Sequence, residues 1–377
     1  MEIISRINKK LVILATFCSC LLSANNAFAI PKETSSLMLD AITGQVISAQ
    51  NADTLMYPAS LTKVMTLYIT FTAIENGTLH FEDKLKVSRI AANRSPSKLG
   101  LKAGDEISVE DAIMALIVKS ANDCATVLAE NIGYSEENFA QTMTAVAKEL
   151  GMKNTIFKNA SGLPNRAQMT TAKDLSILAS AMYHHFPQYY HLFSTTSFTY
   201  NGITYSSHND ILKTFNGADG MKTGFTNAAG FNIITSAERE GKRVIAVTMG
   251  HKTAKERDKN ISVMMDNGLT KLAQNNLSEK TKLAANNDKN FSIQLGAFSN
   301  YAKARKHALS VNEEFTKVSN KNIEIQAVRR RHAVVYRSKI VGFAQNQAEK
   351  ACNDLKKVNK SCIVVSEIKQ NIILAQK

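Results

Sequence analysis

The chain of 377 residues has few cysteines and, after its N-terminal region, no long hydrophobic run. Five cysteines are too few to build a disulfide-rich scaffold. No later stretch is apolar enough to cross a bilayer, and the sequence contains neither an internal repeat nor a low-complexity tract. With 44% hydrophobic residues over this length, the sequence instead predicts two folded domains.

The first 29 residues predict a secretory signal peptide. Arg6 and Lys9-Lys10 form a basic start, Leu11–Leu22 is apolar, and Ala27-Phe28-Ala29 is a small-x-small cleavage site. About twelve apolar residues are too few to span a bilayer, which disfavours a membrane anchor. We therefore expect an exported chain that begins near Ile30 and has no transmembrane segment after processing.

The net charge of +14 is concentrated at the C-terminal end. Residues 290–377 contain 16 Lys and Arg against 6 Asp and Glu, whereas residues 30–273 are nearly balanced. A basic module indicates an anionic partner. Export disfavours nucleic acid, so we expect an anionic envelope polymer, with a merely soluble basic surface as the alternative.

Hydrophobic patterning divides the mature chain into two domains. In residues 30–273, strand patterns lie near both ends and helical patterns lie between them. This order predicts an antiparallel sheet flanked by helices, with a helical second lobe and a closing amphipathic helix over 255–273. The polar residues 274–289 predict a linker.

Residues 290–370 predict a small α+β domain of order βαββαβ, with two helices on one face of an antiparallel sheet. Cys352 and Cys362 both lie in this domain and can pair where thiols are oxidised. Cys124 is most simply a small buried residue on a helix. It is a poor candidate nucleophile, because no histidine is near it in sequence.

Three short motifs follow one another along the first domain: Ser60-Leu61-Thr62-Lys63, Ser120-Ala121-Asn122 and Lys222-Thr223-Gly224. Each is common alone, as part of an ordinary helix, cap or strand. Together, in an exported chain, they are typical of serine acyl-transferases in which lysine replaces histidine as the base. Such sites act chiefly on acyl-D-Ala-D-Ala peptides and β-lactams.

The first two motifs supply the catalytic groups in this interpretation. Ser60 begins a helix as the nucleophile, and Lys63 lies one turn on, within reach of the hydroxyl. Burial and the nearby cation Lys222 lower the pKa of Lys63 so that it acts as a base. Ser120 relays a proton to the leaving amine, and the Asn122 amide orients the peptide group.

The third motif is predicted to begin a strand at the edge of the cleft, where a peptide adds by main-chain hydrogen bonds. Lys222 and Thr223 would hold the terminal carboxylate, and Gly224 would let the ligand approach closely. The N–H groups of Ser60 and Phe225 would form the oxyanion hole. We expect no metal and no other cofactor.

Residues 31–273 resemble the low-molecular-mass penicillin-binding proteins of the D-alanyl-D-alanine carboxypeptidase family. The resemblance extends beyond the motifs to these stretches: Tyr57-Pro58-Ala59-Ser60-Leu61-Thr62-Lys63-Val64-Met65-Thr66, Ser120-Ala121-Asn122-Asp123, Leu150-Gly151-Met152, Asn159-Ala160-Ser161-Gly162-Leu163-Pro164, Asp219-Gly220-Met221-Lys222-Thr223-Gly224-Phe225-Thr226 and Ala229-Gly230. It implies a catalytic domain of the penicillin-binding/β-lactamase type, acylation of Ser60 with Lys63 as base, and inhibition by β-lactams.

The chain departs from the family pattern in two places. The β-rich C-terminal domain and amphipathic tail of many members are not visible. Some members place an arginine near the carboxylate pocket after the last strand, where this chain has Gly250-His251-Lys252-Thr253. Lys252 is therefore a candidate substitute for that arginine, with a solvated loop cation as the alternative.

Residues 290–368 resemble a SPOR domain, a peptidoglycan-binding module. The resemblance lies in Phe291-Ser292-Ile293-Gln294-Leu295-Gly296-Ala297-Phe298 and Tyr336-Arg337-Ser338-Lys339-Ile340-Val341-Gly342-Phe343. Such modules bind glycan strands stripped of stem peptides, whose freed lactyl carboxylates make an anionic polymer. The resemblance implies that Gln294, Arg337 and basic neighbours contact glycan, and it favours a periplasmic, wall-associated protein.

The leading interpretation is a serine carboxypeptidase that removes the terminal D-Ala from pentapeptide stems. A D,D-endopeptidase that cuts cross-links would use the same residues. A class A β-lactamase needs a glutamate for deacylation, and residues 155–159 contain no acid. A non-catalytic glycan-binding protein is the alternative outside the enzyme class.

Overall fold

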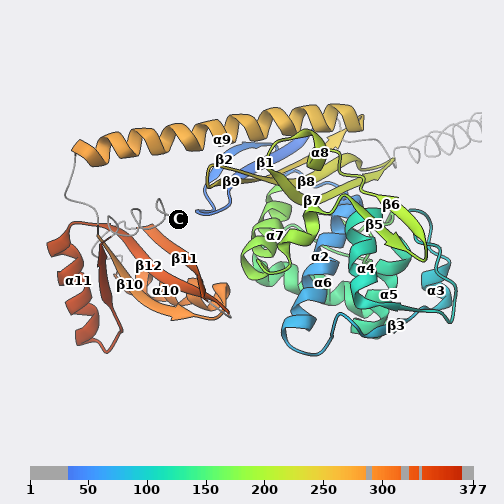
Figure 1. The fold of residues 1–377 in the computed structure, drawn as a ribbon, viewed down its shortest axis with the longest axis horizontal. Coiled ribbons are helices and arrows are strands. Elements are labelled where there is room, and N and C mark those ends of the chain that lie inside the picture. Colours follow the sequence, from blue (N-terminus) through green and yellow to red (C-terminus); the bar gives the residue numbers. More distant parts are fainter. Residues whose placement is uncertain (1–32, 286–290, 316–321, 331–332, 367–377) are drawn as a thin grey trace, which may run out of the picture.

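The computed structural model describes residues 33–285, 291–315, 322–330 and 333–366. The expected signal peptide, residues 1–29, lies outside this range, as do residues 367–370 of the expected second domain. Within the described ranges, Figure 1 shows a larger domain with its sheet at the top and helices below, and a smaller domain to the left. No helix of these ranges has the length and apolarity needed to cross a membrane.

The larger domain is built on a five-stranded antiparallel sheet of order β2-β1-β9-β8-β7. Its strands are β1 (Ser35–Asp40), β2 (Val46–Gln50), β7 (Ala218–Thr226), β8 (Gly230–Arg239) and β9 (Lys242–His251). The hairpin between the last two strands turns at Glu240 and Gly241, which have φ of 52° and 71°, the pair of positive angles that a tight hairpin turn requires. The first and last strands of the domain thus meet in one sheet, as predicted.

The two faces of this sheet bury alternate residues against different helices. Ile233 and Val244 face α9 (Ala254–Ala285) and pack with its Ile261 and Met265. Neighbouring residues of the same strands join the core of the helical lobe, because successive side chains of a strand point to opposite faces. The sheet is therefore a layer between α9 and the lobe (Figure 1).

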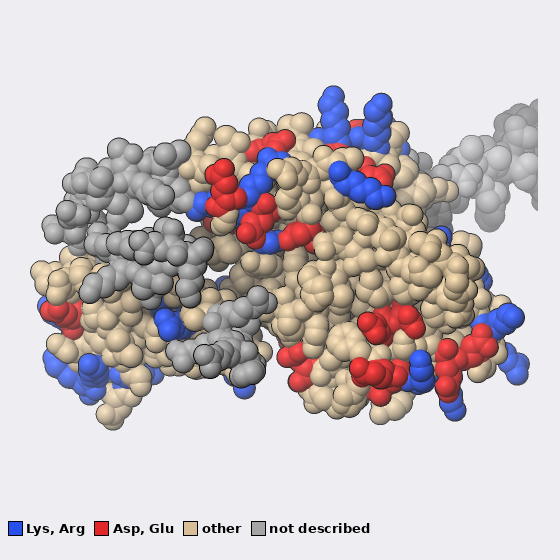
Figure 2. Space-filling view, viewed as in Figure 1, with Lys and Arg blue, Asp and Glu red and all other residues tan. Residues whose placement is uncertain are grey.

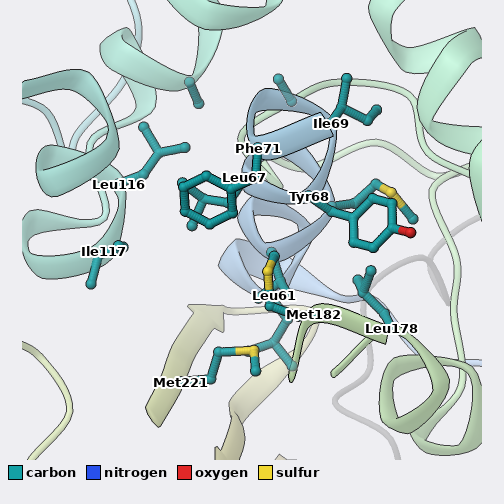
Figure 3. Packing of buried hydrophobic residues seen from close by; sticks show 14 of the residues in the cluster. Leu61, Leu67, Tyr68, Ile69, Phe71, Leu116, Ile117, Leu178, Met182 and Met221 are labelled. Atoms are coloured by element: carbon teal, nitrogen blue, oxygen red, sulfur yellow. The ribbon is translucent and has the colours of Figure 1, made fainter. Parts of the chain in front are cut away.

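The helical lobe surrounds α2 (Thr62–Glu75). Ten consecutive residues of α2, Thr62–Phe71, are buried, which is typical of a helix enclosed on all sides. Figure 3 shows Leu67 and Phe71 of α2 beside Leu116, with Met182 and Met221 near the start of the helix. This core holds the start of α2 against the sheet.

The other elements of the larger domain are short or pack around α2: η1 (Ala59–Leu61), β3 (Lys84–Lys86), α3 (Arg89–Ala92), β4 (Glu106–Ser108), α4 (Val109–Met114), η2 (Ala115–Lys119), α5 (Asn122–Gly133), α6 (Glu136–Leu150), α7 (Ala172–His185), η3 (Tyr190–Ser194), β5 (Ser197–Tyr200), β6 (Ile203–Ser206) and α8 (Ile211–Thr214).

Helix α9 corrects one expectation. It continues to Ala285 instead of ending at Ala273, so most of the expected linker 274–289 is helical. This segment contains no glycine or proline, and its Lys, Glu, Leu and Ala residues favour a helix. The lack of an amphipathic pattern predicted a coil, whereas intrinsic helix propensity decides the conformation here.

The smaller domain has the predicted order βαββαβ. Its elements are β10 (Phe291–Phe298), α10 (Tyr301–Phe315), β11 (Asn322–Arg330), β12 (Ala333–Phe343), α11 (Gln345–Lys357) and β13 (Ile363–Ser366), with sheet order β11-β12-β10-β13. Both helices contribute to one core with Ile293 and Ile340, so they cover the same face. Cys352 and Cys362 form a disulfide between α11 and the start of β13.

The two domains touch through aromatic residues. The ring of Tyr301 stacks on that of His184 with 4.4 Å between centroids. The Tyr336 hydroxyl donates to the main-chain oxygen of His184 at 3.0 Å. Figure 2 shows Lys and Arg gathered over the lower left of the smaller domain and both charge signs over the larger one, which agrees with the charge distribution in the sequence.

Candidate active site

The site begins at the junction of η1 and α2. Ser60 lies in η1 and Lys63 in the first turn of α2, so the two side chains lie one turn apart on one face. The Lys63 ammonium nitrogen, Nζ, lies 3.1 Å from Ser60 Oγ. Ser60 is half-buried and Lys63 is fully buried. The hydroxyl thus faces the cleft while the amine behind it is shielded from water.

Three oxygens surround the Lys63 nitrogen. Besides Ser60 Oγ, they are Asn122 Oδ1 at 2.7 Å and the main-chain oxygen of Ser161 at 2.5 Å. A neutral amine has two N–H groups and one lone pair. Because the amide and main-chain oxygens only accept hydrogen bonds, they take both N–H groups and leave the lone pair for the Ser60 hydroxyl.

The electrostatics of Lys63 favour its neutral form. Burial is the largest cause and, with the charge of Lys222, lowers the pKa of Lys63 well below its ordinary value. Asp123, Cys124 and Glu136 act in the opposite direction. Burial and Lys222 outweigh these three groups, so the net effect lowers the pKa of Lys63 and favours the neutral amine.

Ser120 lies in the connection between η2 and α5, and Asn122 is the first residue of α5. Ser120 has φ of 59°, and its Oγ is buried without a hydrogen bond to any part of the chain that the structure describes. Asn122 contacts Lys63 directly, and its Nδ2 donates to Ser95 O at 2.8 Å. Asn122 thus hydrogen-bonds to Lys63, whereas the buried Ser120 hydroxyl makes no hydrogen bond to the described residues.

The third motif lies in the middle of β7, not at its start as expected, and β7 is an edge strand. Lys222 is 2% exposed, and its Nζ donates to Thr223 O at 3.0 Å. Burial, followed by the charge of Arg257, lowers the pKa of Lys222 to about 7. Phe225 is half exposed and stacks on Phe231.

Gly224 packs against the turn that carries Ser60. A Cβ at this position would lie 3.0 Å from Ser60 N and 3.1 Å from Leu61 N. The missing side chain therefore lets β7 pack closely on this turn. This packing is a second requirement for glycine, beside the predicted close approach of a ligand.

Lys252 does not occupy a buried pocket. Its side chain is exposed, and its main-chain N–H donates to Glu256. The buried cation at this end of the sheet is Arg257 in the first turns of α9, which is 4% exposed and paired with Asp258. Arg257 follows Lys252 by five residues and lies in helix α9, which buries its side chain. Lys252 lies in the loop before the helix, and its side chain is in solvent.

Ser161 is not predictable from its residue type, because it contacts Lys63 through a main-chain oxygen. In the sequence, it is marked only by the family-like stretch Asn159–Pro164. Asn159 Oδ1 accepts from Gly162 N at 2.7 Å, which shapes the turn. Gly162 has φ of +85°, and a Cβ there would lie 1.8 Å from Ala59 O. The glycine lets this turn reach the back of the Ser60 turn.

A hollow of 960 Å³ lies away from Ser60, between α3, α5 and α6. Lys86, Arg94, Tyr134 and Glu136 are among its lining residues, and Ser60 is not. The smaller hollow beside the nucleophile is lined by Tyr57, Gly162, Thr226 and their neighbours. The three motifs thus lie beside the smaller hollow at the edge of β7, and not in the hollow of 960 Å³.

An antiparallel sheet with a helical lobe and a serine–lysine pair at their junction defines the class of penicillin-binding proteins. Penicillin binding protein 6B from Escherichia coli matches with a TM-score of 0.59 and 34% identity, over 72% of this chain and 83% of that chain. Penicillin-Binding Protein D2 from Listeria monocytogenes, in its ampicillin-bound form, matches with a TM-score of 0.58 and 34% identity, over 62% and 96%.

Within that class, the chain belongs to the D-alanyl-D-alanine carboxypeptidase family, whose family model matches residues 25–253. Residues 287–366 match the family model of the SPOR domain. D-alanyl-D-alanine carboxypeptidase DacD of Escherichia coli strain K12 is 40% identical over 230 residues, which are 59% of this chain and 59% of the relative. DacF of Bacillus subtilis strain 168 is 33% identical over 243 residues, or 62% and 61%.

These comparisons confirm the resemblance, the fold class and the C-terminal module expected from the sequence. The chain spans about 59% of the length of the first curated relatives that it matches.

Proposed function

We propose that this chain is a serine-type D-Ala-D-Ala carboxypeptidase that removes the terminal D-Ala from peptidoglycan stem peptides through an acyl-enzyme on Ser60. The observation that carries the proposal is the fully buried Lys63, whose nitrogen lies 3.1 Å from Ser60 Oγ. A buried lysine with a lowered pKa, hydrogen-bonded to a serine at the cleft, is an activated nucleophile pair.

Acylation then follows from the geometry. Lys63 Nζ takes the proton of Ser60 as Oγ attacks the carbonyl carbon of the penultimate D-Ala. The N–H groups of Ser60 and Phe225 stabilise the oxyanion. The C–N bond breaks, and the proton passes to the amine of the departing D-Ala, with Ser120 Oγ as the relay. Water repeats the sequence on the Ser60 ester and frees the shortened peptide.

The edge of β7 provides the substrate track in this proposal. A stem peptide adds to the free edge by main-chain hydrogen bonds. Lys222 and Thr223 bind its terminal carboxylate, while Asn122 orients the peptide group. An exposed Lys252 lies outside this pocket, so we assign the second cation near the carboxylate to Arg257.

The test is release of D-Ala from acyl-L-Lys-D-Ala-D-Ala by the chain lacking residues 1–29. We expect the wild-type chain to release D-Ala, and we expect both the Ser60→Ala substitution and penicillin to abolish this release. Ser194→Ala removes an exposed hydroxyl far along the chain from the motifs and serves as the matched control. Penicillin labelling of Ser60 without D-Ala release would contradict carboxypeptidase activity and direct the assay to cross-linked muropeptides, the endopeptidase alternative.

We further propose that the smaller domain holds the enzyme on glycan outside the cytoplasm, in the periplasm. Gln294 pairs with Lys339 across β10 and β12. The neighbouring Ile293 and Ile340 belong to the core under the helices. Gln294 and Arg337 therefore lie on the sheet face opposite α10 and α11. Both are partly exposed, whereas Lys339 of the same face is buried.

Sedimentation with sacculi tests this second role. The Ser60→Ala chain should bind sacculi stripped of stem peptides more tightly than intact ones, because stripping frees carboxylates. Arg337→Ala should weaken that binding, whereas Lys306→Ala on the helix-covered face removes the same charge and should not. Equal binding to stripped and intact sacculi would refute the proposed selectivity.

A further inference from the structure

The first turn of α5 buries a carboxylate beside the site. Asp123 is 0% exposed. Its Oδ1 accepts the main-chain N–H groups of Leu99 at 3.1 Å and Cys124 at 3.0 Å. Its Oδ2 accepts those of Gly100 at 2.9 Å and Leu101 at 3.2 Å. Four N–H donors stabilise the carboxylate in place of solvent.

Three of these donors belong to the segment 95–101, which also supports Asn122. Ser95 O accepts from Asn122 Nδ2 at 2.8 Å, and Ser97 O accepts from Asn122 N at 2.7 Å. The Ser97 hydroxyl donates to Lys119 O at 2.8 Å. The segment is thus held at one end by Asp123 and holds Asn122 at the other.

The orientation of the Asn122 amide depends on this segment. Because Nδ2 donates to Ser95 O, the opposite atom Oδ1 faces Lys63 at 2.7 Å. If the segment moved, Asn122 Nδ2 would lose its acceptor Ser95 O, the group that distinguishes Nδ2 from Oδ1. Oδ1 would then no longer be held toward Lys63 Nζ.

Asp123 also contributes to the charge balance around Lys63. The groups that act on Lys63 are Lys222 from β7, Asp123 and Cys124 from α5, and Glu136 from α6. Burial raises the pKa of Cys124 well above its ordinary value, so its thiol is neutral at the pH of the reaction. Of the groups that raise the pKa of Lys63 against burial and Lys222, Asp123 has the largest effect.

We propose that Asp123 is a positioning residue of the acyl-transfer site: its carboxylate clamps segment 95–101, which in turn fixes the Asn122 amide against Lys63. The proposal rests on the proposed function, since it assumes that Lys63 is the base. Asp123 itself contacts neither substrate nor nucleophile in this assignment. It acts through two other residues: it fixes the position of the Asn122 amide, and its negative charge raises the pKa of Lys63.

Asp123→Asn is the main variant, because it keeps the shape and removes the charge. Its Nδ2 would place N–H groups against Gly100 N–H and Leu101 N–H, which releases the clamp. Asp174→Asn is the matched control. Asp174 is 2% exposed and accepts from Asn154 N and Thr155 Oγ1, both at 2.8 Å, and it does not act on Lys63.

The readout is the rate of Ser60 acylation by a fluorescent penicillin between pH 4 and pH 9, which does not depend on the peptide substrate. If the Asn122 amide is no longer held against Lys63, the plateau rate of acylation should fall about tenfold to a hundredfold. Loss of the negative charge should move the acidic limb, where Lys63 gains its proton, to lower pH by about one unit. A purely structural defect would lower the plateau without moving the limb.

Ser97→Ala separates the two effects and does not require Asp123→Asn to fold. It removes the hydroxyl contact with Lys119 O but leaves the Asp123 charge, so we expect a lower plateau with an unmoved limb. Trypsin adds a direct probe of the clamp, since release of the segment should expose the bond after Lys98 in Asp123→Asn and not in Asp174→Asn.

The proposal is overturned if Asp123→Asn has the acidic limb and the Lys98 cleavage of the wild type. It is equally overturned if Asp174→Asn reproduces the Asp123→Asn shift, or if Ser97→Ala acylates at the wild-type rate. These outcomes are distinct from failure of the proposed function, in which the wild type would be acylated by penicillin but would release no D-Ala.

Discussion

The Lys63 nitrogen lies 2.5 Å from the main-chain oxygen of Ser161, a residue 98 positions further along the chain. This contact and the one with Asn122 fix the direction of the lysine lone pair toward Ser60. The serine–lysine spacing places the two side chains together, but the Lys63 amine is oriented by a carbonyl group from a distant turn. The proposed activation of Ser60 therefore depends on the assembled lobe.

Replacing Lys63 with methionine keeps most of the side-chain volume and removes the base. We expect Ser60 acylation to fall by about 10²–10⁴-fold, the usual contribution of a general base. The measurement is the second-order rate of penicillin labelling, with circular dichroism to verify folding. Lys158→Met, at an exposed position near the site, is the control. A Lys63→Met variant within tenfold of the wild type would eliminate Lys63 as the base.

The pH dependence should separate binding from chemistry. Lys63 must be neutral, so kcat should rise with pH through its lowered pKa. Lys222 must be charged to hold a carboxylate, and burial lowers its pKa to about 7. KM should therefore increase above about pH 7 as that charge is lost, while kcat remains on its plateau. A KM that stays constant up to pH 9 would show that Lys222 keeps its proton.

Arg257 should influence the same alkaline limb. Its charge is one of the causes of the lowered pKa of Lys222, so Arg257→Leu should raise that pKa. The increase of KM should then begin at a higher pH, by less than about one unit. Lys252→Ala removes an exposed cation and should leave the KM profile unchanged. A changed KM profile in Lys252→Ala, with an unchanged profile in Arg257→Leu, would instead show that Lys252 is the second cation near the carboxylate.

Gly224→Ala tests the packing of β7 on the Ser60 turn. The added Cβ would lie 3.0 Å from Ser60 N, so strand and turn must separate by a few tenths of an ångström. We expect a destabilisation of about 1–3 kcal/mol, typical of overpacking, together with slower acylation. Thermal unfolding and penicillin labelling measure the two effects. Wild-type values for both would mean that the turn accommodates the methyl group.

The disulfide should stabilise the smaller domain. Cys352 and Cys362 are 10 residues apart, and a cross-link that closes a loop of this size contributes about 3 kcal/mol by restricting the unfolded chain. The double variant Cys352→Ala/Cys362→Ala should therefore unfold its smaller domain at lower urea and bind sacculi less at 37 °C. Cys124→Ala, which removes the free buried thiol, is the control for loss of cysteine. Two free thiols in the exported wild type would contradict the pairing.

Local features could be predicted where short-range physics decides them. The turn at Glu240-Gly241, the sheet shared by both ends of the larger domain, and the βαββαβ order all follow from periodicity and turn residues. The three motifs were also visible, because their chemistry restricts residue types. Helix α9 shows the limit, since a segment without an apolar stripe still forms helix to Ala285 on intrinsic propensity.

The sequence by itself determined the family and the second domain, and it predicted Ser60, Lys63, Asn122 and Lys222 as site residues, because each depends on a side-chain type at a set spacing. The tertiary structure decided which groups surround them. It brought the Ser161 carbonyl to Lys63, buried Arg257 instead of Lys252, and made Gly224 a packing residue. Main-chain atoms and burial carry no signature in a linear sequence, since they arise only when distant segments meet.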